Sequence, residues 1–179
     1  MQTAIITGIT GQDGAYLSKY LLALNFKVIG ITRSYSAANI ENLSYLGIKN
    51  KVELVECDMY DLSSILNLLK KYKPNHFYNL AAQSSVGISF LQPISTLKYN
   101  IESVLNILEA IRLCDASIRF YQACSSEMYG SINKLPVTLE SSLNPVSPYA
   151  ISKATAYWLV DMYRKAYNLF AVNGVLFNH

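Results

Sequence analysis

The chain has 179 residues, 51% of them hydrophobic, and a formal net charge of only +3. This length suits one domain with a sizeable core, and the hydrophobic share excludes a disordered chain. The small charge without a basic block argues against nucleic acid as a partner, and no apolar run is long enough to span a membrane.

Cysteine and histidine usage excludes further kinds of site. Cys57, Cys114 and Cys124 are odd in number and lack metal-ligand spacing, and His76 and His179 make no metal pair. The first residues form an apolar strand without a preceding charged region, so no signal peptide is expected. We therefore expect a cytoplasmic protein with reduced core thiols and no bound metal.

A glycine turn opens the chain. The apolar run at 4–6 predicts a buried parallel strand, and Gly8, Gly11 and Gly14 follow it at three-residue spacing. Apolar residues at helical spacing then predict a helix that begins near Asp13. A side chain at Gly8 or Gly11 would obstruct a phosphate on the turn, which the amides of the helix N-terminus would face. The spacing is not the standard G-x-G-x-x-G, and a tight turn without a ligand is the alternative.

Strands and helices alternate along the rest of the chain. The patterns predict strands at 27–32, 52–57, 76–80, 118–124 and 169–177, and helices at 62–72, 94–113 and 147–167. The polar connection at 34–47 has room for a short helix. Such alternation implies an α/β fold, a doubly wound parallel sheet covered on both faces. Ligands are expected at the carboxyl ends of the strands, near the switch point of strand order.

Three segments that follow predicted strands favour a dinucleotide. Arg33 follows the second strand, where an arginine accommodates the 2′-phosphate of NADP and an acidic residue favours NAD. A surface arginine in a loop is the alternative. Asp58 follows the third strand, where it either hydrogen-bonds an adenine amine or caps the next helix. Small residues at 81–85 let the backbone approach a flat ring or a pyrophosphate.

A second group of residues points to catalysis. Ser125 and Glu127 directly follow the fifth strand, and Tyr149 and Lys153 share one face of the next helix. A nearby ammonium lowers a tyrosine pKa toward a range where the phenol acts as a base. A serine hydroxyl beside it can hold the substrate oxygen that loses its proton. Alone, the Tyr-x-x-x-Lys spacing would indicate a surface pair, but together with the glycine turn it indicates an active site.

These motifs resemble those of a known family. Gly8-x-x-Gly11-x-x-Gly14 with Tyr149-x-x-x-Lys153 resembles the extended short-chain dehydrogenase/reductase family. Within it, the whole chain is similar to the GDP-mannose 4,6-dehydratase family, through TGITGQDG at 7–14, NLAAQS at 79–84, SSEMYG at 125–130, SPYAISK at 147–153 and NGVLFNH at 173–179. The resemblance implies a Rossmann-type NADP-binding fold.

The resemblance also implies a reaction, the conversion of GDP-mannose to GDP-4-keto-6-deoxymannose by a lyase with internal hydride transfer through NADP. Tyr149 would take the proton of the sugar 4-hydroxyl, Lys153 would lower its pKa and hold the nicotinamide ribose, and Ser125 would hydrogen-bond the 4-oxygen. Glu127 would remove the C5 proton and help to expel the C6 hydroxyl as water. The implied cofactor residues are Gly8, Ile9, Thr10, Gly11, Gln12, Asp13, Gly14, Arg33, Asp58, Met59, Leu80, Ala81, Ala82, Tyr149, Lys153 and His179. The implied substrate residues are Ser84, Ser85, Ser125 and Asn178.

The chain also departs from the family pattern. Ser125 stands where the family usually has threonine, so a hydroxyl remains. Ser34 stands where the family often has a second arginine, in a loop associated with tetramer contacts; we expect a homo-oligomer, dimer or tetramer, for the full-length protein. The family continues with a region that builds much of the nucleotide-sugar pocket. We therefore expect residues 1–179 to be the dinucleotide-binding domain, with the carboxyl-terminal substrate region absent.

Other functions stay open at this point. A dehydratase of another nucleotide sugar, such as dTDP-glucose, usually carries an Asp-Glu pair where this chain has Ser126 and Glu127. An epimerase or reductase of the same superfamily would not need Glu127. An inactive truncated module that only holds NADP is the alternative from another class.

Overall fold

The computed structural model describes residues 1–34, 39–132 and 135–178. Six parallel strands form one sheet in the order β3-β2-β1-β4-β5-β6. The strands are β1 (Thr3–Thr7), β2 (Lys27–Thr32), β3 (Glu53–Glu56), β4 (His76–Asn79), β5 (Arg119–Ser125) and β6 (Ala171–Leu176). The α-helices are α1 (Gln12–Ala23), α2 (Glu41–Tyr45), α3 (Leu62–Tyr72), α4 (Val86–Leu91), α5 (Pro93–Cys114) and α6 (Pro148–Tyr167), and the short 3₁₀ helices are η1 (Lys49–Lys51) and η2 (Ser126–Tyr129).

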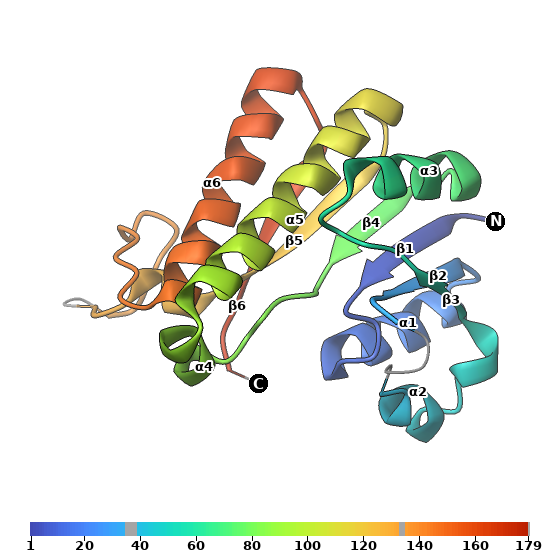
Figure 1. Ribbon diagram of the computed structural model, residues 1–179, viewed down its shortest axis with the longest axis horizontal. Coiled ribbons are helices and arrows are strands. Elements are labelled where there is room, and N and C mark those ends of the chain that lie inside the picture. The colour runs from blue at the N-terminus through green and yellow to red at the C-terminus, as the bar shows by residue number, and fades with distance from the viewer. Residues whose placement is uncertain (35–38, 133–134, 179) are drawn as a thin grey trace.

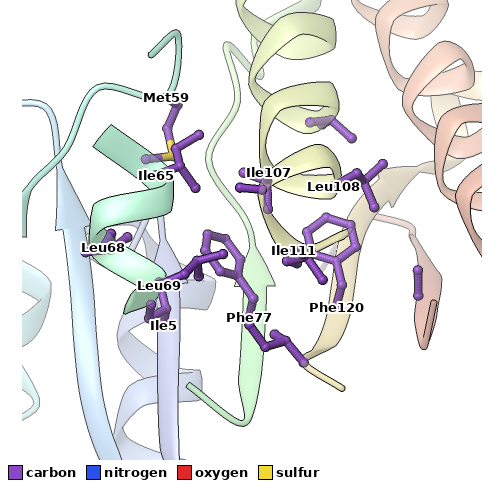
Figure 2. Close-up of a cluster of buried hydrophobic side chains, with 14 of the residues drawn as sticks. Ile5, Met59, Ile65, Leu68, Leu69, Phe77, Ile107, Leu108, Ile111 and Phe120 are labelled. Carbon is purple, nitrogen blue, oxygen red and sulfur yellow. The ribbon is translucent and has the colours of Figure 1, made fainter. Parts of the chain in front are cut away.

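Helices cover both faces of the sheet, as the alternation predicts (Figure 1). Strand β1 lies at the centre, and its side chains alternate between the two faces. Ile5 packs with α3, α5 and α6 in the larger core, whereas Ala4 and Ile6 pack with α1 and α2 in the smaller one. Figure 2 shows the larger core, where Phe77 and Phe120 of neighbouring strands lie against α5. The sheet is therefore doubly wound.

The predicted elements are all present, with ends that differ by one or two residues. The short helix in the polar connection is α2, and α3 has the predicted bounds 62–72. Helix α4 and the 3₁₀ helices η1 and η2 were not predicted from the sequence. Among the described residues, no helix is both long and apolar enough to cross a membrane.

Candidate active site and cofactor groove

The glycine turn joins β1 to α1, and two of its three glycines are required by the chain's own backbone. Gly8 has a φ of +71°, and a Cβ there would lie 2.9 Å from the amide nitrogen of Ala81. A Cβ on Gly14 would collide with the carbonyl oxygen of Gly8, whereas at Gly11 the nearest atom would be 3.3 Å away. The predicted reason, room for a phosphate, is therefore incomplete, because Gly8 and Gly14 are needed for close packing of strand, turn and helix.

A groove of about 940 Å³ lies along this turn, at the carboxyl ends of β1, β2 and β4. Chain segments turn to opposite sides of the sheet between β1 and β4, so this is the switch point of strand order. Small residues line its floor and polar or aromatic residues its rim. The lining residues are Gly8, Thr10, Gly11, Ile31, Thr32, Arg33, Ser34, Asn39, Tyr60, Leu80, Ala81, Ala82, Gln83, Ser84, Gln92, Ser95 and Tyr99. The glycine-lined floor and a basic rim fit a dinucleotide.

The rim at the end of β2 carries Arg33, as predicted, together with two tyrosines that the sequence analysis missed. The Arg33 guanidinium carbon lies 5.8 Å from the centre of the Tyr99 ring, within cation–π range. Tyr60 meets Tyr99 edge to face, with ring centres 5.6 Å apart. Tyr99 lies in the middle of α5, and nothing in its local pattern indicates that it faces the groove.

The structure resolves the alternatives for Asp58 in part. Its carboxylate accepts a hydrogen bond from the amide of Tyr60, at 2.9 Å. Asp61, not Asp58, caps α3 by accepting from the amides of Ser63 and Ser64. The prediction that Asp58 could cap this helix is therefore wrong.

Several predicted cofactor residues can contribute only backbone atoms or lie outside the groove lining. The side chains of Ile9 and Met59 are buried in the two cores; Figure 2 shows Met59 beside Ile65. Gln12 is exposed and Asp13 half-buried in the first turn of α1. His179 lies outside the described residues.

The candidate catalytic side chains come together where β5 meets α6. The Ser125 hydroxyl accepts from the amide of Glu127, at 3.2 Å, and caps η2. Ser125 also hydrogen-bonds the phenol of Tyr149. The ammonium of Lys153 lies 5.8 Å from the centre of the Tyr149 ring. The structure therefore brings all four predicted residues into one cluster.

The electrostatics of this cluster differ from the expectation. Burial raises the pKa of Tyr149 above its ordinary value, and the hydrogen bond with Ser125 offsets this in part. Burial also lowers the pKa of Lys153 to about 8. The expected lowering of the tyrosine pKa by the ammonium is not found, because removal from water dominates at both groups.

A buried amide ties the cluster to the groove. Asn100 of α5 donates to the carbonyl of Gln83 at 3.1 Å and to the hydroxyl of Ser152 at 2.9 Å, and it accepts from the amide of Gln83 at 2.8 Å. Gln83 belongs to the loop after β4, which Figure 1 shows running to α4, and Ser152 precedes Lys153 on α6. The role of Asn100 was not predicted, because a single polar residue within a helix does not indicate which residues it will contact.

The predicted substrate residues lie farther apart in the fold than the candidate catalytic residues do. Ser84 lines the groove and is exposed. The Ser85 hydroxyl accepts from the amide of Ile88 at 3.3 Å and so caps α4. Asn178 is exposed beyond the end of β6. Of the predicted substrate residues, only Ser125 belongs to the cluster.

Known proteins match this chain in sequence over nearly all of its length. The family model for GDP-mannose 4,6 dehydratase matches residues 5–179. GDP-mannose 4,6 dehydratase from Drosophila melanogaster is 42% identical over 99% of this chain and 47% of that protein. The corresponding protein from Vibrio cholerae is 41% identical over 98% of this chain and 49% of that protein. The chain thus spans about half the length of the curated relatives it matches.

Solved structures match the fold. UDP-glucose 4-epimerase from Brucella ovis, in complex with NAD, superposes with a TM-score of 0.88 at 24% identity, over 99% of this chain and 52% of that chain. DesIV, a dTDP-glucose 4,6-dehydratase from Streptomyces venezuelae with NAD and TYD bound, has a TM-score of 0.86 at 24% identity, over 97% of this chain and 55% of that chain. At these identities the matches show the fold alone.

Proposed function

Since the chain belongs to the GDP-mannose 4,6-dehydratase family, we propose that it forms the cofactor-binding and catalytic part of an enzyme that converts GDP-mannose to GDP-4-keto-6-deoxymannose. The observation that carries this proposal is the cluster of Ser125, Glu127, Tyr149 and Lys153 at the carboxyl end of β5. We further propose that residues 1–179 are its dinucleotide-binding domain and that the substrate region lies in a part of the enzyme outside this chain.

The proposed cofactor is NADP. When bound, it would accept one hydride from the substrate and return it, so that no external reductant is consumed. The glycine turn and the residues Leu80 to Ala82 would hold its phosphates and rings, and Arg33 would pair with its 2′-phosphate. The solved structures named above contain NAD, so the choice of NADP rests on Arg33 and on the absence of an acidic residue at that position.

In the proposed reaction, the phenol oxygen of Tyr149 takes the proton of the sugar 4-hydroxyl, and the Ser125 hydroxyl orients that oxygen. Burial raises the pKa of Tyr149, and the hydrogen bond with Ser125 offsets this in part, so the phenolate forms less readily than in water. Glu127 then removes the proton from C5, which the 4-ketone has made acidic, and helps to expel the C6 hydroxyl as water.

The position of Glu127 favours a dehydratase over an epimerase or reductase. Its amide donates to the Ser125 hydroxyl, so the two residues occupy one short segment after β5 and can reach one sugar ring. A simple oxidation and reduction at C4 needs Ser125, Tyr149 and Lys153 but no second acid–base group. The elimination across C5 and C6 does need one.

We also propose that the whole enzyme is a cytoplasmic homo-oligomer. Exposed apolar side chains recur on one face of α6, at Ile151, Trp158 and Met162, as they do on surfaces that pair with a second copy. Neither the dimer nor the tetramer is favoured by the described residues.

The function is tested with Glu127→Gln in a chimera that joins this chain to the carboxyl-terminal half of the Vibrio cholerae relative. We expect the chimera to form the 4-keto product from GDP-mannose. We expect the variant to bind both ligands but to dehydrate about 10²–10⁴-fold more slowly, because glutamine cannot take a proton. Exchange of the C5 proton with deuterated solvent, followed by mass spectrometry, should stop as well.

Glu140→Gln is the matched control, since Glu140 is an exposed glutamate of a loop outside the cluster. It should dehydrate at the parent rate. An unchanged rate in Glu127→Gln would remove Glu127 from the acid–base role, and with it the preference for a dehydratase.

A further inference from the structure

A line of buried polar side chains crosses the centre of the sheet, from the glycine turn to Lys153. Thr7 of β1 donates its hydroxyl hydrogen to the Asn79 side-chain oxygen on β4, at 2.6 Å. The Asn79 amide group donates to the side-chain oxygen of Gln122 on β5, at 2.8 Å. Gln122 in turn donates to the carbonyl oxygen of Ala123, at 2.9 Å. Thr7, Asn79 and Gln122 are each only 1% exposed, so water cannot replace these partners.

The direction of this line is determined at its first residue. The Thr7 hydroxyl oxygen accepts from the backbone amides of Leu80 and Ala81, both at 3.1 Å. Two N–H groups occupy its acceptor positions, so its own hydrogen must point to Asn79. The Asn79 side chain must then present its oxygen to Thr7 and its NH₂ group to Gln122. The same argument fixes Gln122 with its oxygen toward Asn79 and its NH₂ group toward Ala123.

The line ends at the candidate catalytic lysine. The Ala123 carbonyl oxygen that accepts from Gln122 also accepts from the Lys153 ammonium, at 2.7 Å. An ammonium has three N–H groups, and Ala123 supplies the one acceptor found for Lys153 among the described residues. The side-chain NH₂ group of Gln122 and the ammonium of Lys153 therefore donate to the same acceptor, the Ala123 carbonyl oxygen.

We infer that Thr7, Asn79 and Gln122 are positioning residues for Lys153, because they hold the N–H group of Gln122 on the carbonyl oxygen to which Lys153 also donates. The inference rests on the proposed function for the role of Lys153 itself. With the Gln122 N–H in place, the Ala123 oxygen is shared by two donors and holds the ammonium less strongly than it would alone. Leu80 and Ala81 contact both Gly8 and the Thr7 hydroxyl, so this line of hydrogen bonds joins the glycine turn to Lys153.

The orientation has an electrostatic consequence that can be measured. An acceptor beside an ammonium favours the charged form, whereas an N–H group beside it disfavours that form. Burial lowers the pKa of Lys153, and the Cys124 thiol on β5 acts in the opposite direction. Tyr149 is the titratable neighbour on α6 itself, and α5 contributes the neutral Asn100 through Ser152.

The test is an NMR titration of the Lys153 side chain in the 179-residue chain, without cofactor or substrate, with the signal assigned from Lys153→Arg. In Asn79→Leu, Gln122 loses the donor that holds its oxygen, so its amide is free to leave the Ala123 oxygen to Lys153 alone. Loss of this competing donor should raise the titration midpoint of Lys153 by about one pH unit, the low end of the range for a hydrogen bond to a charged group. Looser packing around the buried lysine would also raise this midpoint, but it would do so whether or not Gln122 is present.

A double-mutant comparison isolates the role of Gln122. In a Gln122→Met background, no amide remains to turn, so adding Asn79→Leu should not move the midpoint further. A midpoint unchanged in Asn79→Leu, or an equal increase in the Gln122→Met background, would overturn the inference. Neither result would bear on dehydration itself, which the Glu127 variants test separately.

Two further variants protect the test against a failure to fold. Thr7→Val removes the hydroxyl that sets the direction and should raise the midpoint, whereas Thr7→Ser keeps the hydroxyl and should leave it at the parent value. Ser103→Ala is the matched control, since the buried Ser103 hydroxyl donates within α5, to the carbonyl of Tyr99. An equal midpoint in Thr7→Val and Thr7→Ser, or an increase in Ser103→Ala, would also contradict the inference.

Discussion

At the scale of single residues, burial acts on Tyr149 and Lys153 in opposite senses. It raises the pKa of the phenol and lowers that of the ammonium, so both groups are moved toward their neutral forms. The four-residue spacing of the pair could be predicted from the sequence, but this balance could not. It depends on how deeply α6 buries the two side chains against β5, which is a property of tertiary packing.

Lys153 should make the stability of the chain depend on pH. The folded chain releases the Lys153 proton near pH 8, whereas the unfolded chain keeps it until about its ordinary pKa of 10.5. The unfolded state thus binds more protons between these values, and the free energy of unfolding rises with pH there. Relative to Lys153→Met, the parent should gain about 3 kcal/mol across this window, as measured by denaturant unfolding. Parallel pH profiles for the two proteins would contradict the effect of burial.

Arg33 should decide between the two nicotinamide cofactors. We expect this chain to bind NADP more tightly than NAD, and Arg33→Ala to weaken NADP by about 1.5–3 kcal/mol while leaving NAD nearly unchanged. Calorimetric titration with each cofactor measures both affinities. Lys98→Ala is the control, because Lys98 is also stacked on a groove tyrosine, Tyr60, but does not line the groove. Equal affinity of the parent for both cofactors would remove Arg33 from this role.

At the scale of elements, the sequence predicts the strands and helices that are long enough to show a periodic pattern of apolar residues. The strands and the long helices stand out because apolar residues recur over many positions, and α3 has the predicted bounds. Helix α4 was missed because its six residues are too few for a helical period, and Gly87 within it suggests a turn. The partners of Tyr99 and Asn100 were missed for another reason, since the contacts of a helix face depend on which strand and loop it packs against.

The glycine turn offers a test at this scale. Gly8 and Gly47 both have positive φ, but a Cβ at Gly47 meets no atom within 4 Å, whereas one at Gly8 approaches the backbone of Leu80 and Ala81. We expect Gly47→Ala to lower the free energy of unfolding by about 1–2 kcal/mol, the cost of the left-handed conformation. Gly8→Ala should cost about 2–5 kcal/mol, because backbone displacement adds to that strain. Equal losses in chemical denaturation would show that the close approach does not matter.

At the scale of the whole molecule, the described residues form a six-stranded sheet, and the chain spans about half the length of the relatives it matches. The doubly wound fold and the switch-point groove follow from the order of strands and helices, so both could be predicted. The contacts with the proposed substrate could not be predicted, because of the expected substrate residues only Ser84 and Ser125 lie at the groove or the cluster.

The cofactor groove and the substrate contacts should therefore be separable by experiment, in assays of NADP binding and of turnover. Residues 1–179 alone should bind NADP but give little keto product from GDP-mannose, because binding energy from the remote parts of the substrate is missing. The chimera with the Vibrio cholerae half is the control and should turn over. Cofactor titration and product analysis by mass spectrometry measure the two properties. Turnover by the 179 residues alone at the rate of the chimera would mean that they already contain a complete site.

The contacts of Gly8 and Gly14 with the chain's own backbone also bear on how such a sequence drifts over generations. A descendant that no longer bound any nucleotide would still be destabilised if either glycine were replaced, because the obstruction is internal. Purifying selection would therefore keep both glycines in an inactive copy of the gene for as long as the folded chain was useful. The roles proposed for the Arg33 and Glu127 side chains are chemical, so these would be the first positions to change after a loss of activity.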